Sequence, residues 1–359
     1  MLDYFSNTDL LKTPSKRAAY SDRTSYVMAE MSRLAYFKFE GGSNIDELLE
    51  SARTLIPEGT DISAFEVLIK SSVVSDSPEK GEEILRSILT KHDFELVSTY
   101  SDTGSGAQAF LCSCDMQKLA ILAFRGTEPS LKDIKADVKA NLVEEKNANG
   151  KFLIHSGYLG QFKSLEHKIR SDLESGALDG LQLFITGHSL GGALAITAVK
   201  FLASDITGAC YTFGSPPVGT KDFDRDIKTP IYRIVNHVDI VPRLPNPILV
   251  YVVRLFAMAV DLLLSPFAGF SSTIKESDWY KKIRKALLDA QKYRQSGYGS
   301  FLVGEGSDAR LRYNVSMFDR IVWWIKQFKN IFRGDFKILS DHSIDEYSRK
   351  LAVWAENRK

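Results

Sequence analysis

The segment Gly187-His188-Ser189-Leu190-Gly191 has the residue types and spacing of a serine nucleophile held on a tight turn. An apolar run at 181–186 precedes it, and a run with helical spacing at 192–203 follows it. Such a strand-to-helix turn strains the backbone at the serine and leaves no room for side chains at the flanking glycines. The helix start offers N–H groups to negative charge developing on a substrate. We therefore predict that Ser189 is a nucleophile; an inert glycine-serine turn is the alternative.

A serine hydroxyl needs a base to take its proton, and the base needs an acid that orients it. In folds built around this turn, the acid and then the base follow the nucleophile along the chain. Of the six histidines, only His237 and His342 follow Ser189. Asp239 lies just after an apolar run at 231–235, and His237 precedes it. Chain order therefore predicts Asp239 as the acid and, by elimination, His342 as the base.

Other residues compete for these roles. Three carboxylates are expected on a solvated helix, and a fourth, in an apolar run, is expected to be an ion-pair partner: Asp222, Asp224 and Asp226, then Asp261. His188 is expected to orient a neighbour or to lie in the core, and His155 and His237 are expected to be satisfied structural histidines.

The elements that must position these residues alternate between strands and helices. Short runs rich in Val, Ile, Phe and Leu predict strands at 94–100, 107–114, 118–124, 181–186, 208–213 and 231–235. Helical spacing predicts helices at 23–39, 45–55, 78–91, 131–143, 157–173, 192–203, 221–227 and 343–356. This alternation indicates an α/β protein with a mostly parallel central sheet flanked by helices. Together with the turn at Ser189 it predicts the α/β-hydrolase fold, with a helical insertion between acid and base.

Four short motifs follow one another along the chain: Phe124-Arg125-Gly126-Thr127, His155-Ser156-Gly157-Tyr158, Gly187 to Gly192, and Asp239-Ile240-Val241-Pro242. In this order they resemble the class 3 lipases, a fungal-lipase-like family, over roughly 94–245 and again at His342. The resemblance implies an oxyanion hole formed by the backbone N–H groups of Thr127 and Leu190; for Thr127, a simple turn threonine is the alternative. The interval between Asp239 and His342 is longer than is usual in that family.

The composition of the 359-residue chain, with 44% apolar and 25% charged residues, is typical of a globular protein. We expect an N-terminal helical region at 1–92, a hydrolase core at 93–245 and 338–359, and a helical insertion at 246–337. In the insertion, 248–264 is almost entirely apolar. It predicts a lid or interface-seeking helix; a buried helix is the next alternative, and a membrane span is disfavoured by its length and its two charges.

Charge is unevenly distributed, because 275–337 holds 14 basic and 7 acidic residues although the whole chain has a net charge of +1. Two amphipathic runs, at 279–294 and 317–333, have apolar and basic faces that suit an anionic bilayer surface. Helices packed on each other, with their lysines in water, would give the same pattern. We predict no nucleic-acid partner, and no protein partner can be deduced.

Cysteine usage and the N-terminus bear on location. Cys112, Cys114 and Cys210 cannot form a disulfide framework and are expected to be reduced, buried thiols. The first twenty residues have no unbroken apolar core of the kind a signal peptide needs. We therefore expect a cytoplasmic protein, or one exported by a route independent of a signal peptide, with peripheral membrane contact.

Together these observations predict a lipolytic carboxylic ester hydrolase, of the lipase or phospholipase A type, acting on lipid esters through an acyl-serine intermediate. No metal and no organic cofactor are expected. One alternative is an esterase or thioesterase for small soluble esters. An alternative of another class is a non-catalytic membrane-binding protein on a hydrolase scaffold.

Overall fold

The computed structural model describes residues 3–13, 19–39, 78–126, 142–202, 206–237, 239, 241–243, 291–313, 315–316, 319 and 341–358. Its centre is an eight-stranded sheet in the order β1-β2-β3-β6-β7-β9-β11-β12. Five strands run parallel: β3 (Leu119–Phe124), β6 (Gln182–His188), β7 (Thr207–Phe213), β9 (Ile231–Asn236) and β11 (Tyr298–Val303). Antiparallel strands complete both edges: β1 (Glu95–Asp102), β2 (Ala107–Cys114) and β12 (Arg310–Arg312).

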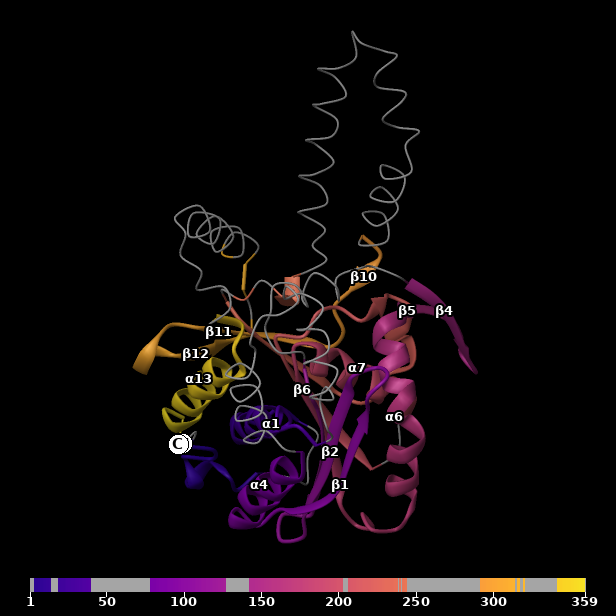
Figure 1. Cartoon of the computed structure of the whole chain (residues 1–359). Coiled ribbons are helices and arrows are strands. Elements are labelled where there is room, and N and C mark those ends of the chain that lie inside the picture. Colours follow the sequence, from indigo (N-terminus) through magenta and orange to yellow (C-terminus); the bar gives the residue numbers. More distant parts are fainter. Residues whose placement is uncertain are drawn as a thin grey trace, which may run out of the picture.

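Helices cover both faces of this sheet (Figure 1). One face packs against α1 (Asp22–Leu34), α4 (Pro78–Lys91) and α13 (Ile344–Glu356), and the other against α6 (Ser156–Glu174) and α7 (Leu190–Leu202). Every residue of β3 is buried, as its unbroken apolar sequence requires of a strand covered on both sides. The predicted α/β-hydrolase architecture, a mostly parallel sheet flanked by helices, is confirmed.

A second, four-stranded sheet has the order β10-β8-β5-β4. It contains the hairpin of β4 (Leu142–Asn147) and β5 (Gly150–His155), together with the two-residue strands β8 (Gly219–Thr220) and β10 (Tyr293–Arg294). The helix predicted at 131–143 differs from this arrangement. Residues 131–141 lie outside the described residues, and Leu142 and Val143 begin β4, because they pair with β5 across the two-residue turn Ala148-Asn149.

The stretch predicted to be a helical insertion also differs from the prediction where it is described. Residues 291–313 form β10, β11 and β12. β11 pairs in parallel with β9, from Tyr298 opposite Tyr232 to Leu302 opposite Asn236, so it covers an edge of β9 that would otherwise be open. β11 and β12 therefore belong to the core sheet, whereas β10 belongs to the four-stranded sheet. The apolar run at 248–264 lies outside the described residues, as does almost all of 317–333. None of the described helices combines the length and the hydropathy that crossing a bilayer requires.

Candidate active site

Ser189 lies at the turn between β6 and α7 and has a left-handed backbone, with φ of 56°. The turn is tight on both sides of it. A Cβ atom on Gly187 would lie 2.1 Å from the carbonyl oxygen of Gly191, and one on Gly191 would lie 2.3 Å from that of Phe124. The Ser189 N–H donates to the carbonyl of Phe213 in the neighbouring β7, at 2.9 Å. The sequence therefore places a strained serine at the carboxyl ends of the parallel strands.

Ser189, Asp239 and His342 lie in one hydrogen-bonded line. The Ser189 Oγ lies 2.8 Å from the Nε2 of His342, and the Nδ1 of His342 lies 2.8 Å from the Oδ2 of Asp239. Asp239 follows β9, and His342 comes directly before Ser343, the N-cap of α13. All three side chains are buried. Because a carboxylate only accepts, Nδ1 carries the hydrogen, and Nε2 is free to accept the serine proton.

Two further groups hold the carboxylate of Asp239. The backbone N–H of Val241 donates to its Oδ1 at 2.9 Å, and the hydroxyl of Tyr347 donates to its Oδ2 at 2.6 Å. The same hydroxyl accepts the N–H of Asn236 at 2.9 Å. Hydrogen bonds to a buried carboxylate stabilise its charge and fix its orientation. Asp239 is thereby held in one orientation toward His342.

His188 contacts the backbone of His342. Its Nε2 lies 2.6 Å from the His342 carbonyl oxygen, and its Nδ1 lies 2.7 Å from the hydroxyl of Tyr36. A carbonyl only accepts, so Nε2 is the donor and the Tyr36 hydroxyl donates to Nδ1. Burial, together with the neighbouring His342 ring, holds the pKa of His188 well below its ordinary value, so the imidazole is neutral. His188 therefore orients a neighbour, as one of its sequence interpretations proposed.

The remaining predicted residues fall into three groups. Leu190 is the first residue of α7, where backbone N–H groups have no partner within the helix. Thr127 and Asp261 lie outside the described residues. The other candidates have contacts away from the triad. His155 caps α6 by accepting the N–H of Gly157 at 3.1 Å, and Asp226 pairs with Lys200 at 3.2 Å.

Three residues near the site were not singled out from the sequence: Tyr36, Gly214 and Tyr347. Gly214 has φ of 61°, and a Cβ there would lie 2.8 Å from the Oδ2 of Asp239 and 3.0 Å from the Cε1 of His342. A side chain at this position would thus displace the acid and the base. Gly214 follows a predicted strand, which is a signal for a close approach. The two tyrosines carry no such signal in the sequence.

Among the described residues, no group of three histidine, cysteine, aspartate or glutamate side chains could hold a metal ion. The chemistry open to the described groups is proton transfer from a serine hydroxyl to a buried, carboxylate-held imidazole. This makes the Ser189 oxygen a nucleophile toward an electrophilic carbon such as that of an ester carbonyl.

Part of the chain is similar to known proteins. Residues 121–248 match the family described as Lipase (class 3). The chain is 28% identical to a lipase of Rhizopus niveus over 166 residues, which are 43% of this chain and 41% of that protein. It is 34% identical to the secreted mono- and diacylglycerol lipase 1 of Fusarium solani over 98 residues, 26% of this chain and 29% of the relative. It is 28% identical to a phospholipase A(1) of Arabidopsis thaliana over 153 residues, 36% and 34% of the two chains. The chain thus spans less than half the length of these relatives.

Among solved structures, lipase II from Rhizopus niveus superimposes with a TM-score of 0.46 at 21% identity, covering 63% of this chain and 72% of that one. A lipase from Rhizopus microsporus var. chinensis gives a TM-score of 0.46 at 19% identity, covering 86% and 85%. The fold assignment rests on the sheet and helices described above.

Proposed function

We propose that this chain, which belongs to the class 3 lipase family, is a lipolytic carboxylic ester hydrolase that acts through an acyl-Ser189 intermediate. The observation that carries the proposal is the buried line from Ser189 through His342 to Asp239, with both hydrogen bonds at 2.8 Å. Each group has the neighbour that its role requires.

In the first half-reaction the Ser189 oxygen attacks the ester carbonyl carbon while the Nε2 of His342 takes the hydroxyl proton. The carbonyl oxygen becomes an oxyanion, which we assign to the backbone N–H groups of Leu190 and Thr127. Collapse of this intermediate breaks the bond to the leaving alcohol, and His342 gives its proton to that alcohol. Water then repeats the sequence on the acyl-serine and releases the fatty acid. Asp239 holds the imidazole and balances its charge.

The substrate class follows from the relatives, whose names include lipases, a mono- and diacylglycerol lipase and a phospholipase A(1). We assign the chain a lipid ester. The test is a panel in which purified protein meets triacylglycerol emulsions, phospholipid vesicles and a short water-soluble ester, with Ser189→Ala as the blank. Release of fatty acid from a lipid, absent in the blank, is expected. Turnover of the soluble ester alone would replace this proposal with a small-molecule esterase.

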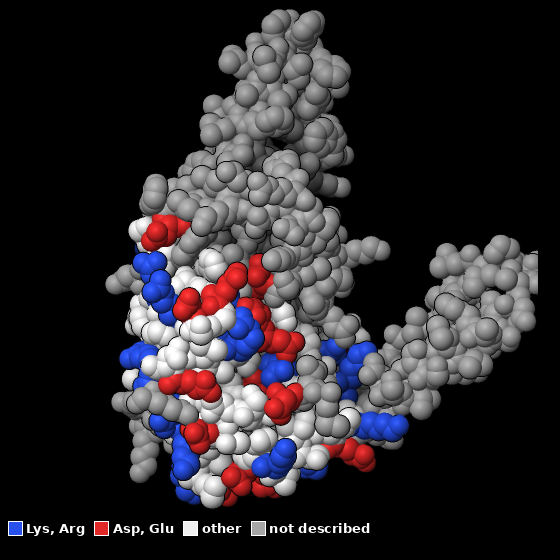
Figure 2. Space-filling model, turned by 90° about the vertical axis from the view of Figure 1, so that its left-hand side faces the viewer, with Lys and Arg blue, Asp and Glu red and all other residues white. Residues whose placement is uncertain are grey.

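We also propose that the enzyme reaches its substrate by peripheral contact with an anionic lipid surface. Support comes from the excess of seven positive charges in 275–337. On the face in Figure 2, acidic and basic side chains are interspersed over the described residues, so no single-sign patch stands out there. Sedimentation with liposomes tests this contact. Binding that requires anionic lipid and weakens as salt rises is expected; equal binding to neutral liposomes would overturn it.

A further inference from the structure

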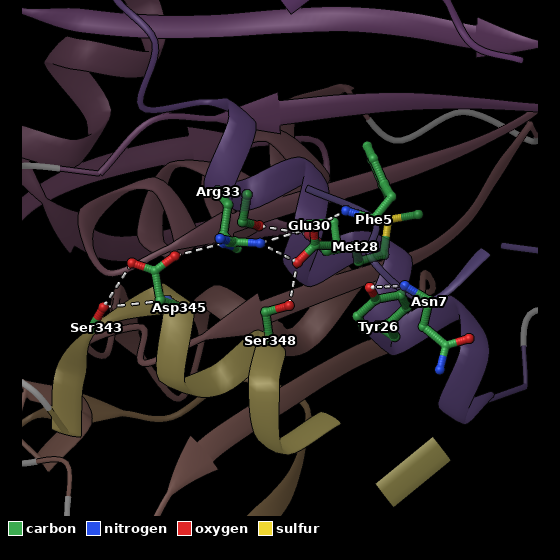
Figure 3. A network of polar contacts seen from close by, with 10 residues as sticks. Phe5, Asn7, Tyr26, Met28, Glu30, Arg33, Ser343, Asp345 and Ser348 are labelled. Atoms are coloured by element: carbon green, nitrogen blue, oxygen red, sulfur yellow. Dashed lines mark hydrogen bonds and ion pairs between the residues drawn. The ribbon is translucent and has the colours of Figure 1, made fainter. Parts of the chain in front are cut away.

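Glu30, in the middle of α1, is a buried carboxylate with three partners. Its side chain is 1% exposed. It accepts the backbone N–H of Phe5 at 2.6 Å and the Nη1 of Arg33 at 2.7 Å, and the hydroxyl of Ser348 in α13 donates to it. Figure 3 shows these groups converging on Glu30 between the two helices. A buried charge satisfied in this way occupies a fixed position.

Arg33 connects the fixed carboxylate of Glu30 to α13. While its Nη1 faces Glu30, its Nε donates to the Oδ1 of Asp345 at 2.7 Å. The planar guanidinium thus joins two carboxylates on different helices (Figure 3). Its side chain is only 11% exposed, whereas that of Asp345 is 57% exposed. Glu30 and Arg33 are therefore the anchored part of the contact, and Asp345 is the part that is held.

Asp345 lies in the first turn of α13, three residues after His342. Its N–H donates to the Oγ of the N-cap Ser343 at 3.3 Å, so the cap and Asp345 move together. Ser343 is the residue directly after His342. The position of Asp345 therefore fixes the backbone directly after His342, whose imidazole faces Ser189.

Besides the hydrogen bond between Ser348 and Glu30, the two helices have two polar contacts, one at Arg33 and one at their other end. Asp22, the first residue of α1, accepts the indole N–H of Trp354 at 2.8 Å and pairs with Arg358 at 3.3 Å. Both contacts join α1 to α13 or to the residues just after it, but only the one at Arg33 adjoins His342. The molecule thus offers a matched pair of contacts, one near the site and one far from it.

We propose that Arg33 is a positioning residue for His342: anchored by Glu30, it holds Asp345 and so keeps the imidazole within hydrogen-bonding reach of Ser189. The inference rests on the proposed function, because it gives α1 a part in that reaction. α1 lies outside the motifs that carry the family resemblance. Small displacements of a reacting group lower rates steeply, and a 1 Å misplacement costs up to about 10²-fold.

The test uses Asp345→Asn, because this change weakens the held end and leaves the buried Glu30–Arg33 pair intact. Two readouts are compared: kcat and KM on a short ester, and the rate at which a fluorophosphonate labels Ser189. We expect kcat and the labelling rate to fall together by about 10-fold at unchanged KM. Asp345→Glu should recover part of both, because it restores the charge.

Two controls separate positioning from stability. Asp22→Asn weakens the far contact by removing the charge that pairs with Arg358, and Glu346→Gln removes the other acidic residue in the first turn of α13. Both should lower the melting temperature while Ser189 is labelled at the wild-type rate. Slowing as large as that of Asp345→Asn in either control would overturn the proposal, as would wild-type labelling of folded Asp345→Asn. A wild-type protein that is not labelled at Ser189 would instead refute the proposed function.

Discussion

The turn that carries Ser189 and the segment that carries His342 are joined by two hydrogen bonds, from Ser189 and from His188, but are built in different ways. The turn is local, because its shape depends on two glycines within two residues of Ser189 and on the adjoining strands β3 and β7. The segment around His342 depends on residues distant in the sequence. Its imidazole bonds a carboxylate 103 positions earlier, and its carbonyl accepts from His188, 154 positions earlier.

This difference predicts how each region fails. A substitution in the turn either alters the nucleophile itself or places a side chain against backbone atoms. We therefore expect it to abolish activity rather than to reduce it in part. The segment around His342 is held by several side-chain contacts, each of net worth about 0.5–3 kcal/mol. Loss of one such contact should therefore reduce activity only in part. The predictions below run from an almost complete loss of activity to a slight change in stability.

The largest effect is expected from Ser189→Ala. The fold should persist, since the change removes only a hydroxyl, and turnover should fall by about 10⁴- to 10⁶-fold. Ester hydrolysis and labelling by a fluorophosphonate, located by peptide mass spectrometry, measure it. Labelling at another residue, or an active alanine variant, would refute the assignment of the nucleophile.

On the other side of the hydrogen bond, His342→Ala and Asp239→Asn should each lower kcat by about 10⁴-fold or more. Either change combined with Ser189→Ala should add little, because the three residues act as a unit. His237→Ala is the matched control, because this histidine lies two residues before Asp239 and its backbone N–H bonds the Leu302 carbonyl. Equal damage in a folded His237→Ala would mean that the base is misassigned.

Tyr347→Phe should have an intermediate effect. It removes the donor to Asp239 at 2.6 Å and the acceptor for the Asn236 N–H at 2.9 Å. Loss of a hydrogen bond to a charged group should lower the free energy of unfolding by about 1.5–3 kcal/mol, and kcat should fall by about 10-fold as the acid loses its fixed orientation. Urea unfolding and ester turnover measure the two. Tyr298→Phe, at a residue 70% exposed, is the control and should change neither.

These contacts also mark how far the sequence could predict the site. Ser189 was predictable because its motif is contiguous, and Asp239 and His342 because chain order leaves few candidates. Tyr36, just after α1, and Tyr347, in α13, were not, since their partners are set only once the helices are packed. Cys112, Cys114 and Cys210 were expected to be buried thiols because they lie in apolar strands, and all three are buried. β11 was missed because the sheet edge that it covers is formed by a strand more than sixty residues earlier.

A smaller effect concerns stability and pH beside His342. Burial raises the pKa of Asp341 to about 6; Lys350 opposes the shift, and the acids Asp239, Glu346 and Glu305 add to it. The folded state binds this proton more tightly than the unfolded state does. The contribution of the protonated Asp341 carboxyl to the free energy of unfolding is therefore fully present below about pH 4 and is lost as pH rises through about 6.

Asp341→Asn should therefore be more stable than the wild type at about pH 8, by about 1–2 kcal/mol given the partial exposure of the group. The difference should disappear near pH 4. Thermal unfolding across this range measures it. Asp115→Asn, at a side chain 85% exposed, is the control and should follow the wild type. A gain in stability that is the same at all pH values would argue against the buried carboxyl as its cause.

The smallest effect returns to the turn and tests its strain directly. Ser189 has φ of 56°, a conformation that costs a residue with a Cβ about 1–2 kcal/mol and costs glycine nothing. Alanine keeps that cost and glycine relieves it, although glycine also gains freedom in the unfolded chain. Ser189→Gly should therefore be more stable than Ser189→Ala by about 1 kcal/mol, with both variants inactive. Chemical denaturation of the two inactive proteins measures the difference. If alanine were the more stable of the two, the nucleophile's backbone would store no strain, and the turn would owe its shape to the glycines alone.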